Sequence, residues 1–211
     1  MQSSNTIACD LYDIGCVKFG QFKLKSGLIS PIYVDLRLLV SHPVVLRSVA
    51  SAMAVEITGA PVASGNGQGK PEIHFDRLAA IPYAGLPIGV AVALETGRPL
   101  IYPRKEAKDY GTAKLIEGDY HAGETALLVD DLITKGTSKI ESLKPLTDAG
   151  LQVKDVLVLI DREQGGRAEL AAYGITLHAV LTLPQILNDL VAAGRLTASQ
   201  QVEIMTWIRA N

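Results

Sequence analysis

One stretch of thirteen residues, 127–139, constrains the fold of this chain more than any other and reads LLVDDLITKGTSK. A short apolar run, 125–129, leads into two adjacent carboxylates, Asp130 and Asp131. A loop rich in hydroxyl groups and glycine follows, and apolar residues then recur at helical spacing until about residue 150. A short continuous apolar run is typical of a strand buried on both faces of a parallel sheet. The stretch therefore predicts a strand, a loop and a helix in direct succession.

The loop after the two carboxylates has the chemistry of a phosphate-binding site. Backbone N–H groups at the start of a helix favour an anion, and the helix macrodipole adds to this preference. Gly136 has no Cβ, so a phosphate can approach the backbone closely. The pattern GxxxxGK[ST] is absent, so the loop is not a Walker A motif. The residues expected to surround the phosphate are Thr134, Lys135, Gly136, Thr137 and Ser138.

Asp130 and Asp131 suit a different task from the loop that follows them. Two carboxylates can accept hydrogen bonds from the hydroxyl groups of a ribose and lie near a divalent metal. The alternative is that each aspartate only closes a strand or caps a turn, which is the commoner role of a lone aspartate in a loop. The length of the ordered motif favours the ligand-binding interpretation.

The composition and the charge argue against several classes of function. At 211 residues, with 48% apolar and 20% charged residues, the chain matches one globular α/β domain with a full core. A formal net charge of −2 gives no electrostatic reason to expect nucleic acid or an anionic membrane as a partner. No stretch of ~20 apolar residues could span a bilayer. We therefore expect a soluble, cytoplasmic protein that binds neither nucleic acid nor membrane.

Cys9 and Cys16 are expected to stay reduced. If they lie on one helix, their seven-residue separation places them ~10.5 Å apart along its axis. A disulfide requires Cα atoms within ~7 Å, and two cysteines alone are too few for a zinc site. Reduced packing cysteines agree with a cytoplasmic location.

Strand and helix patterns alternate through the middle of the chain. This alternation argues for a central parallel sheet with helices on both faces. Ligands in such sheets bind outside the carboxyl ends of the strands, where Asp130 and Asp131 are expected. The predicted strands cover residues 77–82, 100–102, 125–129, 153–160 and 175–181.

The two ends of the chain are expected to complete one domain, 1–211. A helix over 3–18 and two short strands around a turn at residues 26–27 predict a small N-terminal hood. The hood covers about 1–40 and is joined by C-terminal elements, and the core covers about 43–183. Further helices are predicted over 43–58, 184–193 and 197–209.

Two motifs carry a resemblance to a known family. The stretch 127–139 resembles the phosphoribosyl-pyrophosphate (PRPP) signature of type I phosphoribosyltransferases. The stretch FKLKSGLISPIYVDLR, 22–37, is similar to the N-terminal hood of orotate phosphoribosyltransferases. This resemblance implies that Lys25 reaches into the active site and that Tyr33 borders the orotate ring. By its pattern alone, Lys25 would be a solvated lysine on a strand.

A third motif lies in a long polar connection, 103–121, which reads PRKEAKDYGTAKLIEGDYH. Its charges balance, so composition alone favours a solvated hairpin, although connections this long inside a domain are often lids. Its order resembles the mobile catalytic loop of orotate phosphoribosyltransferases, which implies a homodimer in which the loop reaches the neighbouring active site. By position, Arg104, Lys105 and Lys108 would hold the pyrophosphate, with Lys108 stabilising or protonating it. Tyr110 stands where many members have histidine, and tyrosine cannot be a cation near neutral pH.

The fourth motif, DREQGGR, covers residues 161–167. An arginine at a strand end is commonly a surface salt-bridge partner, but the resemblance implies that Arg162 faces orotate. A guanidinium group suits a planar anion with a carboxylate and ring carbonyls. Ala84 stands where many bacterial members have lysine, which resembles the transferase half of uridine monophosphate synthases. The decarboxylase half would need a further ~250 residues, so only the transferase step is expected.

The resemblance implies transfer of phosphoribosyl from PRPP to orotate, giving orotidine 5′-monophosphate and pyrophosphate in UMP biosynthesis. It implies Mg²⁺ held mainly by PRPP, assisted by Asp130 and Asp131. Lys25 and Lys108 join these two acids as catalytic candidates, and Thr134 also borders orotate. Two alternatives remain open: a purine or uracil phosphoribosyltransferase, and a regulatory protein that binds nucleic acid.

Overall fold

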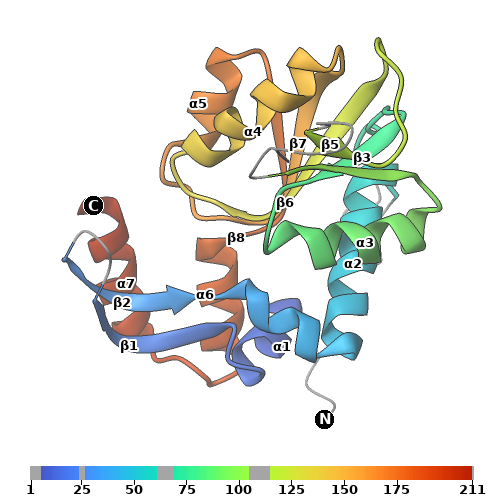
Figure 1. Ribbon diagram of the computed structural model, residues 1–211. Coiled ribbons are helices and arrows are strands. Elements are labelled where there is room, and N and C mark those ends of the chain that lie inside the picture. Colours follow the sequence, from blue (N-terminus) through green and yellow to red (C-terminus); the bar gives the residue numbers. More distant parts are fainter. Residues whose placement is uncertain (1–5, 24–26, 61–68, 105–114, 211) are drawn as a thin grey trace. The chain divides into compact units, whose positions relative to one another are not determined.

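The computed structural model describes most of the chain, which forms two compact units (Figure 1). The first unit comprises Met1–Ser48 and Leu181–Asn211, and the second is Val49–Val180. The motif at 127–139 therefore lies wholly in the second unit. The described residues are 6–23, 27–60, 69–104 and 115–210.

The first unit is built on an antiparallel pair of strands. β1 and β2 pair from Val17 opposite Val34 to Lys23 opposite Ile29. Helix α1 packs against α6, and α7 packs against β2 and α6. The antiparallel pair predicted around residues 26–27 is confirmed. The elements of this unit are α1 (Ile7–Asp13), β1 (Val17–Lys23), β2 (Ile29–Val34), the 3-10 helix η1 (Leu36–Ser41), α6 (Leu183–Ala192) and α7 (Ala198–Ala210).

Helix α1 is shorter than the helix predicted over 3–18. Its cap is Thr6, whose side chain accepts the N–H of Cys9. Gly15, with φ of 77°, donates to the carbonyl of Tyr12, and the next N–H in the chain reaches back to Leu11. This pair of bonds closes a helix around a left-handed glycine. The prediction was therefore wrong beyond the cap at Ile14, and β1 begins at Val17.

The second unit contains a six-stranded sheet in the order β5-β4-β3-β6-β7-β8. The strand pairs β3–β4, β3–β6 and β6–β7 are parallel, whereas β5 is antiparallel to β4. The predicted sheet is thus confirmed, with one short antiparallel strand that the sequence did not indicate. The strands are β3 (Arg77–Ala80), β4 (Leu100–Pro103), β5 (Ile116–Glu117), β6 (Thr125–Ile133), β7 (Gln152–Asp161) and β8 (Thr176–Thr182).

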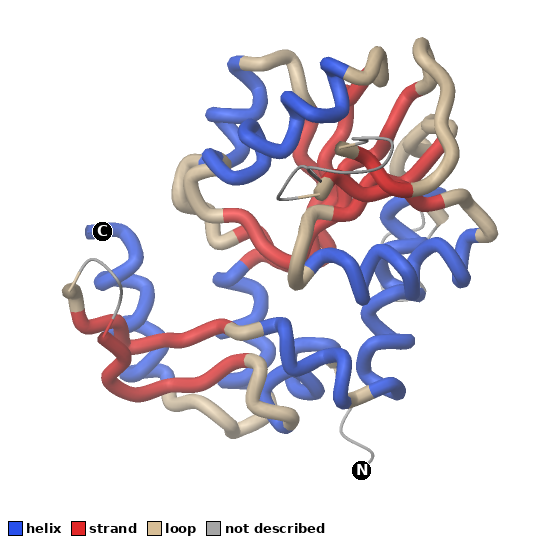
Figure 2. The backbone as a smooth tube through the Cα atoms, viewed as in Figure 1, coloured by secondary structure: helices blue, strands red, loops and turns tan. Residues whose placement is uncertain are grey.

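Helices cover both faces of this sheet (Figure 2). On one face, Leu146 of α4 and Leu170 of α5 pack in a buried cluster with Leu128 of β6. On the other face, α3 lies so close to β3 that a Cβ on Gly89 would sit 2.6 Å from the Cβ of Ala80. Because both faces are covered, the central strands are apolar without alternation. The helices are α2 (Pro43–Thr58), α3 (Gly85–Thr96), α4 (Thr137–Asp148) and α5 (Gly166–Ala172).

The strand order reverses between β3 and β6. From β3 the chain passes through α3 to β4 on one side, and from β6 it passes through α4 to β7 on the other. In open α/β sheets, ligands bind at the carboxyl ends of the strands beside such a reversal. The fold therefore points to the ends of β3 and β6 as the site.

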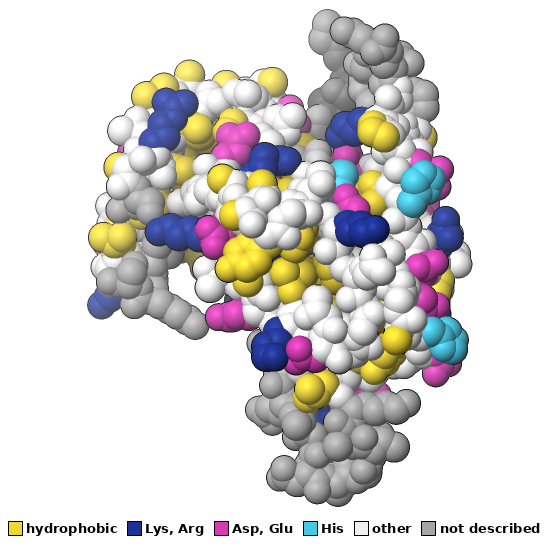
Figure 3. Space-filling model, turned by 90° about the horizontal axis from the view of Figure 1, so that it is seen from above, with side chains coloured by type: hydrophobic (Ala, Val, Ile, Leu, Met, Phe, Trp, Pro, Cys, Tyr) yellow, Lys and Arg dark blue, Asp and Glu magenta, His cyan; other side chains and the backbone are white. Residues whose placement is uncertain are grey.

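The surface of the described residues carries mixed charge. On the face shown in Figure 3, Lys and Arg side chains lie among Asp and Glu side chains. This agrees with the formal net charge of −2. In the described ranges, no helix has both the length and the apolar character needed to cross a membrane.

Candidate functional site

Asp130 and Asp131 lie inside β6, not after it. The strand was expected to end at Val129, but pairing with the long neighbour β7 carries it to Ile133. Pairing with β3 stops at Val129, opposite Ala80. One edge of the last part of β6 therefore has no described strand paired to it, because β3 is followed by α3 at this point. The two carboxylates stand at the reversal of the strand order, where a ligand is expected.

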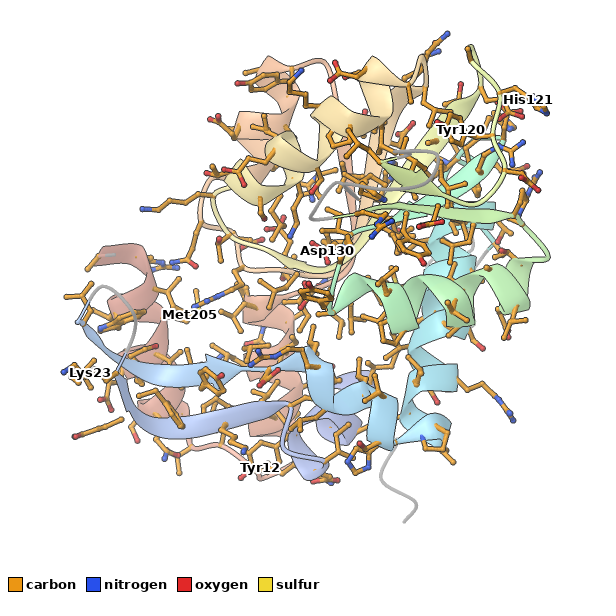
Figure 4. The ribbon with its side chains drawn as sticks, viewed as in Figure 1. Tyr12, Lys23, Tyr120, His121, Asp130 and Met205 are labelled. Carbon is orange, nitrogen blue, oxygen red and sulfur yellow. The ribbon has the colours of Figure 1, made fainter. Side chains whose placement is uncertain are left out.

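The start of α3 lies directly against Asp130 (Figure 4). A Cβ on Gly85 would sit 2.8 Å from Oδ1 of Asp130 and 3.1 Å from the carbonyl oxygen of Val129. Only glycine fits this position without displacing one of the two. Ala84, at the N-cap of α3, makes no side-chain capping bond, and the peptide bond between Pro82 and Tyr83 is cis.

Asp130 forms a buried ion pair that the sequence-based analysis missed. Nζ of Lys139 lies 2.5 Å from Oδ2 of Asp130, and the two side chains are only 6% and 8% exposed. The other oxygen, Oδ1, accepts the N–H of Asp131 at 2.9 Å. A signal existed, because Lys139 falls on the same helical stripe as Leu143 and Leu146. A lysine in an apolar stripe predicts a buried partner.

The carboxyl group of Asp131 has a raised pKa. Burial, followed by the charge of Asp130, raises the pKa of the Asp131 carboxyl to about 7, although the cation of Lys139 opposes this rise. Its Oδ1 accepts the N–H of Leu132 at 2.7 Å. Near neutral pH both the protonated acid and the carboxylate of Asp131 are therefore present. The carboxylate form can accept hydrogen bonds from sugar hydroxyls.

The loop after β6 has the geometry of an anion site. Gly136 is the N-cap of α4, with φ of 87°, and it has no side chain to cap the helix. The first N–H groups of a helix have no partner within it, so those of α4 can bind a phosphate. Gly166 supports the loop, donating to the carbonyl of Thr134 at 2.8 Å. The side chains of Lys135, Thr137 and Ser138 are exposed beside it.

A cavity of about 460 Å³ opens beside this loop within the second unit. It brings together Arg104, which follows β4, and Ser138 of the predicted phosphate loop. Two sequence-predicted site residues thus line one hollow. The remaining lining residues are Ile81, Pro82, Pro103, Glu141, Ser142 and Pro145.

The base of the connection over 103–121 is a hairpin. Arg104 donates its backbone N–H to the carbonyl of Leu115 at 2.7 Å, and β4 pairs with β5 beside it. The guanidinium of Arg104 lies 3.3 Å from Glu117. The base of the connection is therefore an antiparallel pair of strands. The predicted pyrophosphate ligands Lys105, Lys108 and Tyr110 lie outside the described residues.

Arg162 follows the end of β7, and its Nε atom is buried. Its backbone N–H donates to the carbonyl of Ile133, which ties it to the end of β6. Its Nε has no hydrogen-bond partner among the described residues, and burial lowers the pKa of its guanidinium. An ion pair at this strand end is instead made by the exposed Arg167, which lies 3.3 Å from the buried Asp161. A buried donor without a partner is costly, and an anionic ligand would satisfy it.

The turn that holds Arg162 is tightly wound. Glu163 has a left-handed φ of 56°, which is uncommon for a residue with a side chain. The carboxylate of Asp161 accepts its N–H at 2.8 Å and so stabilises the turn. Arg162 is thereby held between the strand and a fixed bend.

Known proteins resemble this chain over most of its length. Orotate phosphoribosyltransferase of Caenorhabditis elegans is 39% identical over 196 residues, covering 93% of this chain and 82% of that protein. The chain belongs to the orotate phosphoribosyltransferase family. Uridine 5′-monophosphate synthase of Bos taurus is 39% identical over 206 residues, or 98% of this chain and 41% of that protein. The chain thus spans less than half of that relative.

The fold of the family is also confirmed by a solved relative. The crystal structure of orotate phosphoribosyltransferase from Aeropyrum pernix has 34% identity and a TM-score of 0.70, covering 88% of this chain and 98% of that chain. No protein-family model matches the chain. The family and the type I phosphoribosyltransferase fold predicted from the four motifs are both confirmed.

The structure describes part of the stretch 22–37, which resembles the hood of orotate phosphoribosyltransferases. Tyr33 stacks on Phe22 with ring centroids 5.4 Å apart, and its hydroxyl lies 3.5 Å from Arg37. Asp35 holds the same arginine at 2.7 Å. Lys25 lies outside the described residues. The contacts of Tyr33 to orotate, implied by the resemblance, remain a prediction.

The two acids of β6 have the chemistry that a magnesium ion prefers. Mg²⁺ prefers oxygen ligands and commonly binds one or two carboxylates, substrate phosphates and water. Asp131 is the more exposed acid, while one oxygen of Asp130 is occupied by Lys139. Over the described ranges, no three His, Cys, Asp or Glu side chains gather in a metal-binding group.

Proposed function

We propose that this protein transfers the phosphoribosyl group of PRPP to orotate, giving orotidine 5′-monophosphate and pyrophosphate in UMP biosynthesis. Family membership and the acid pair before the phosphate loop support a PRPP site. The observation that carries orotate as the acceptor is Arg162, which is tied to the same end of the sheet and whose buried Nε lacks a partner among the described residues. A carboxylate on a planar ring is the natural partner of such a guanidinium group.

The PRPP subsites follow from the residues of β6 and its loop. Asp130 and Asp131 orient the ribose hydroxyl groups, and the N–H groups at the start of α4 hold the 5′-phosphate. The contacts to the 5′-phosphate position the sugar without taking part in bond breaking. The residues proposed to bind the 5′-phosphate are Thr134, Lys135, Gly136, Thr137 and Ser138.

The chemical step forms the bond between N1 of orotate and C1′, breaks the bond from C1′ to the pyrophosphate oxygen, and releases the N1 proton to solvent. Orotate is already anionic, so the barrier lies in charge developing on the leaving group and on the sugar. Arg104, Lys105, Lys108 and Tyr110 bind the pyrophosphate, and Lys108 stabilises or protonates it. When bound, Mg²⁺ offsets the negative charge of the pyrophosphate. Lys25 is a further catalytic group in this proposal.

The residues proposed to bind orotate follow from the resemblance. Arg162 faces the orotate carboxylate and ring carbonyls, and Thr134 borders the ring from the phosphate loop. The resemblance assigns Lys25 and Tyr33 to orotate as well. We also propose that the protein is a homodimer in which the connection over 103–121 reaches the neighbouring active site. Residues 1–211 are proposed to form a single domain.

A cytoplasmic location is part of the same proposal. Cys9 and Cys16 are both free and buried. Burial raises the pKa of the Cys16 thiol to about 11, which keeps it protonated and unreactive. Two unpaired thiols agree with a reducing compartment.

The decisive experiment is the loss of orotate absorbance in the presence of PRPP, with and without Mg²⁺. Orotate turnover that requires PRPP is expected, while adenine, hypoxanthine and uracil should react far more slowly. Lys108→Ala should lower kcat about a hundredfold, on the scale of losing one preorganised donor. Absence of turnover with orotate, or faster turnover with a purine, would overturn the proposal. A nucleic-acid shift assay tests the regulatory alternative.

A further inference from the structure

Lys139 is a buried cation in the first turn of α4, and the mechanism above gives it no role. The residue is 5% exposed on a helix stripe that continues with Leu143 and Leu146. A cation near the N-terminus of a helix also opposes the helix macrodipole. Both features disfavour a lysine here, so its partner must offset the cost.

The partner is Asp130, and its carboxylate is fixed at both oxygens. Oδ2 lies 2.5 Å from Nζ of Lys139. Oδ1 accepts the N–H of Asp131 at 2.9 Å and lies against the backbone of Gly85. The carboxylate therefore has one orientation, set jointly by β6, α3 and α4.

Stability alone is a weak explanation for this pair. Replacing a buried ion pair by apolar residues of similar volume is often neutral or stabilising. The pair also joins two parts of the proposed site, because Lys139 directly follows the phosphate loop that ends at Ser138. One side chain thus links the acid for the ribose to the loop for the phosphate.

We propose that Lys139 is a positioning residue that locks the carboxylate of Asp130 to the first turn of α4 and so fixes the spacing between the ribose and 5′-phosphate subsites. The inference rests on the proposed phosphoribosyl transfer. PRPP spans both subsites, whereas orotate spans neither. Loosening the spacing should therefore weaken PRPP binding more than orotate binding.

Three variants test the proposal. Lys139→Met removes the charge at similar length, and Lys139→Arg keeps the charge. Lys144→Met is the matched control, because Lys144 lies on the same helix but is exposed and pairs with Asp148 one turn away. Each is measured for kcat, for KM of both substrates, for PRPP affinity by calorimetry and for Tm.

The expected result is a split between the two substrates. Lys139→Met should raise KM and Kd for PRPP roughly tenfold, a usual size of coupling between contacting residues. The KM for orotate should change much less, Lys139→Arg should recover most of the PRPP affinity, and Lys144→Met should match the wild type. A lower Tm for Lys139→Met with unchanged PRPP affinity would show a merely structural role and overturn the proposal.

A double variant keeps the test decisive if Lys139→Met fails to fold. Asp130→Asn combined with Lys139→Met leaves no unpaired buried charge. In the Asp130→Asn background, Lys139→Met should cause no further loss of PRPP affinity, because the lysine acts through the aspartate. An additive loss would overturn the inference. Failure of the wild type to turn over orotate would instead count against the proposed function.

Discussion

The charged groups at the two ends of the parallel sheet differ in how completely they are hydrogen-bonded. At the amino end, Arg77 pairs with Glu124 and also donates to the carbonyl of Asp119. Glu124 further accepts the N–H of His121 at 2.7 Å (His121 is labelled in Figure 4). Asp76 accepts the N–H of Thr125 at 2.7 Å. These groups satisfy one another near the surface and tie the end of the long connection to the sheet.

At the carboxyl end, Asp131 and Arg162 are partly buried and incompletely satisfied. Asp131 has its pKa raised to about 7 by burial and by the charge of Asp130. Arg162 keeps a buried Nε without a partner among the described residues. Satisfied charges stabilise a fold, whereas desolvated groups with unused hydrogen-bonding capacity mark a place where a ligand belongs. Desolvated groups with unused hydrogen-bonding capacity therefore identify the functional end of this sheet.

The largest difference between the two ends should appear when one carboxylate is neutralised at each. Asp131→Asn should lower kcat/KM for PRPP by about a hundredfold, because hydrogen bonds to a charged acceptor are lost. Glu124→Gln, at the amino end, should leave kcat/KM nearly unchanged. Steady-state kinetics with orotate and PRPP measures both. Equal losses in the two variants would contradict the division of roles.

Removing one arginine at each end should separate substrate binding from folding. Arg162→Met should raise KM for orotate roughly thirtyfold, the size expected for one charged hydrogen bond, with little change in KM for PRPP. Arg77→Met should lower Tm and leave both KM values close to wild type. Substrate-saturation curves and thermal unfolding check this. A rise in KM for PRPP instead of orotate would move Arg162 to the other subsite.

A pH profile should sharpen the comparison further. Since Asp131 titrates near pH 7, PRPP binding should tighten as pH rises from 6 to 8, roughly tenfold if the carboxylate is required. PRPP carries its own phosphate that titrates near pH 6, so Asp131→Asn is the control and should show only that weaker dependence. Identical profiles would exclude Asp131 as the titrating group.

The raised pKa of Asp131 also determines how the free energy of unfolding depends on pH. The folded pKa of Asp131 lies above its ordinary value of 3.8. The folded state therefore binds more protons than the unfolded state between these values. This group lowers the free energy of unfolding as pH rises from 3.8 to about 7.

The amino end should show the opposite sign and the smallest effect. The hydrogen bond from Arg77 lowers the pKa of Glu124 to about 2. The stabilisation from Glu124 is therefore fully present above its ordinary pKa and is lost as pH falls toward 2. Between pH 6 and 3, wild-type Tm should fall by a few degrees more than that of Glu124→Gln. Glu203→Gln, an exposed change on α7, should follow the wild type.

Much of the candidate site was predictable because it is contiguous. The phosphate loop and the start of α4 depend on Gly136 and on local hydrogen bonds, so their pattern is visible in the sequence. The stop of α1 was equally local, at Gly15, and was missed although its signal was present. The short strand β5 has no such signal, because two residues are too few for a pattern.

The extension of β6 could not be predicted from its own residues. Asp130 and Asp131 disfavour a strand by propensity, yet pairing with the long β7 carries β6 through them. Strand length here is set by the neighbour, which is a property of register. The same register places both acids in the part of β6 that has no pairing with β3.

By itself, the sequence determined the family, the parallel sheet and the loop that follows β6, because each depends on residues close together in the chain. Only the tertiary structure decided that Lys139 would be buried against Asp130 and that Gly85 would touch the same carboxylate. It also decided that Nε of Arg162 would find no partner in the described part of the chain. These features depend on which strands become neighbours and on how far each one pairs. Burial and partners at the ends of strands arise from that packing, and local periodicity carries no record of it.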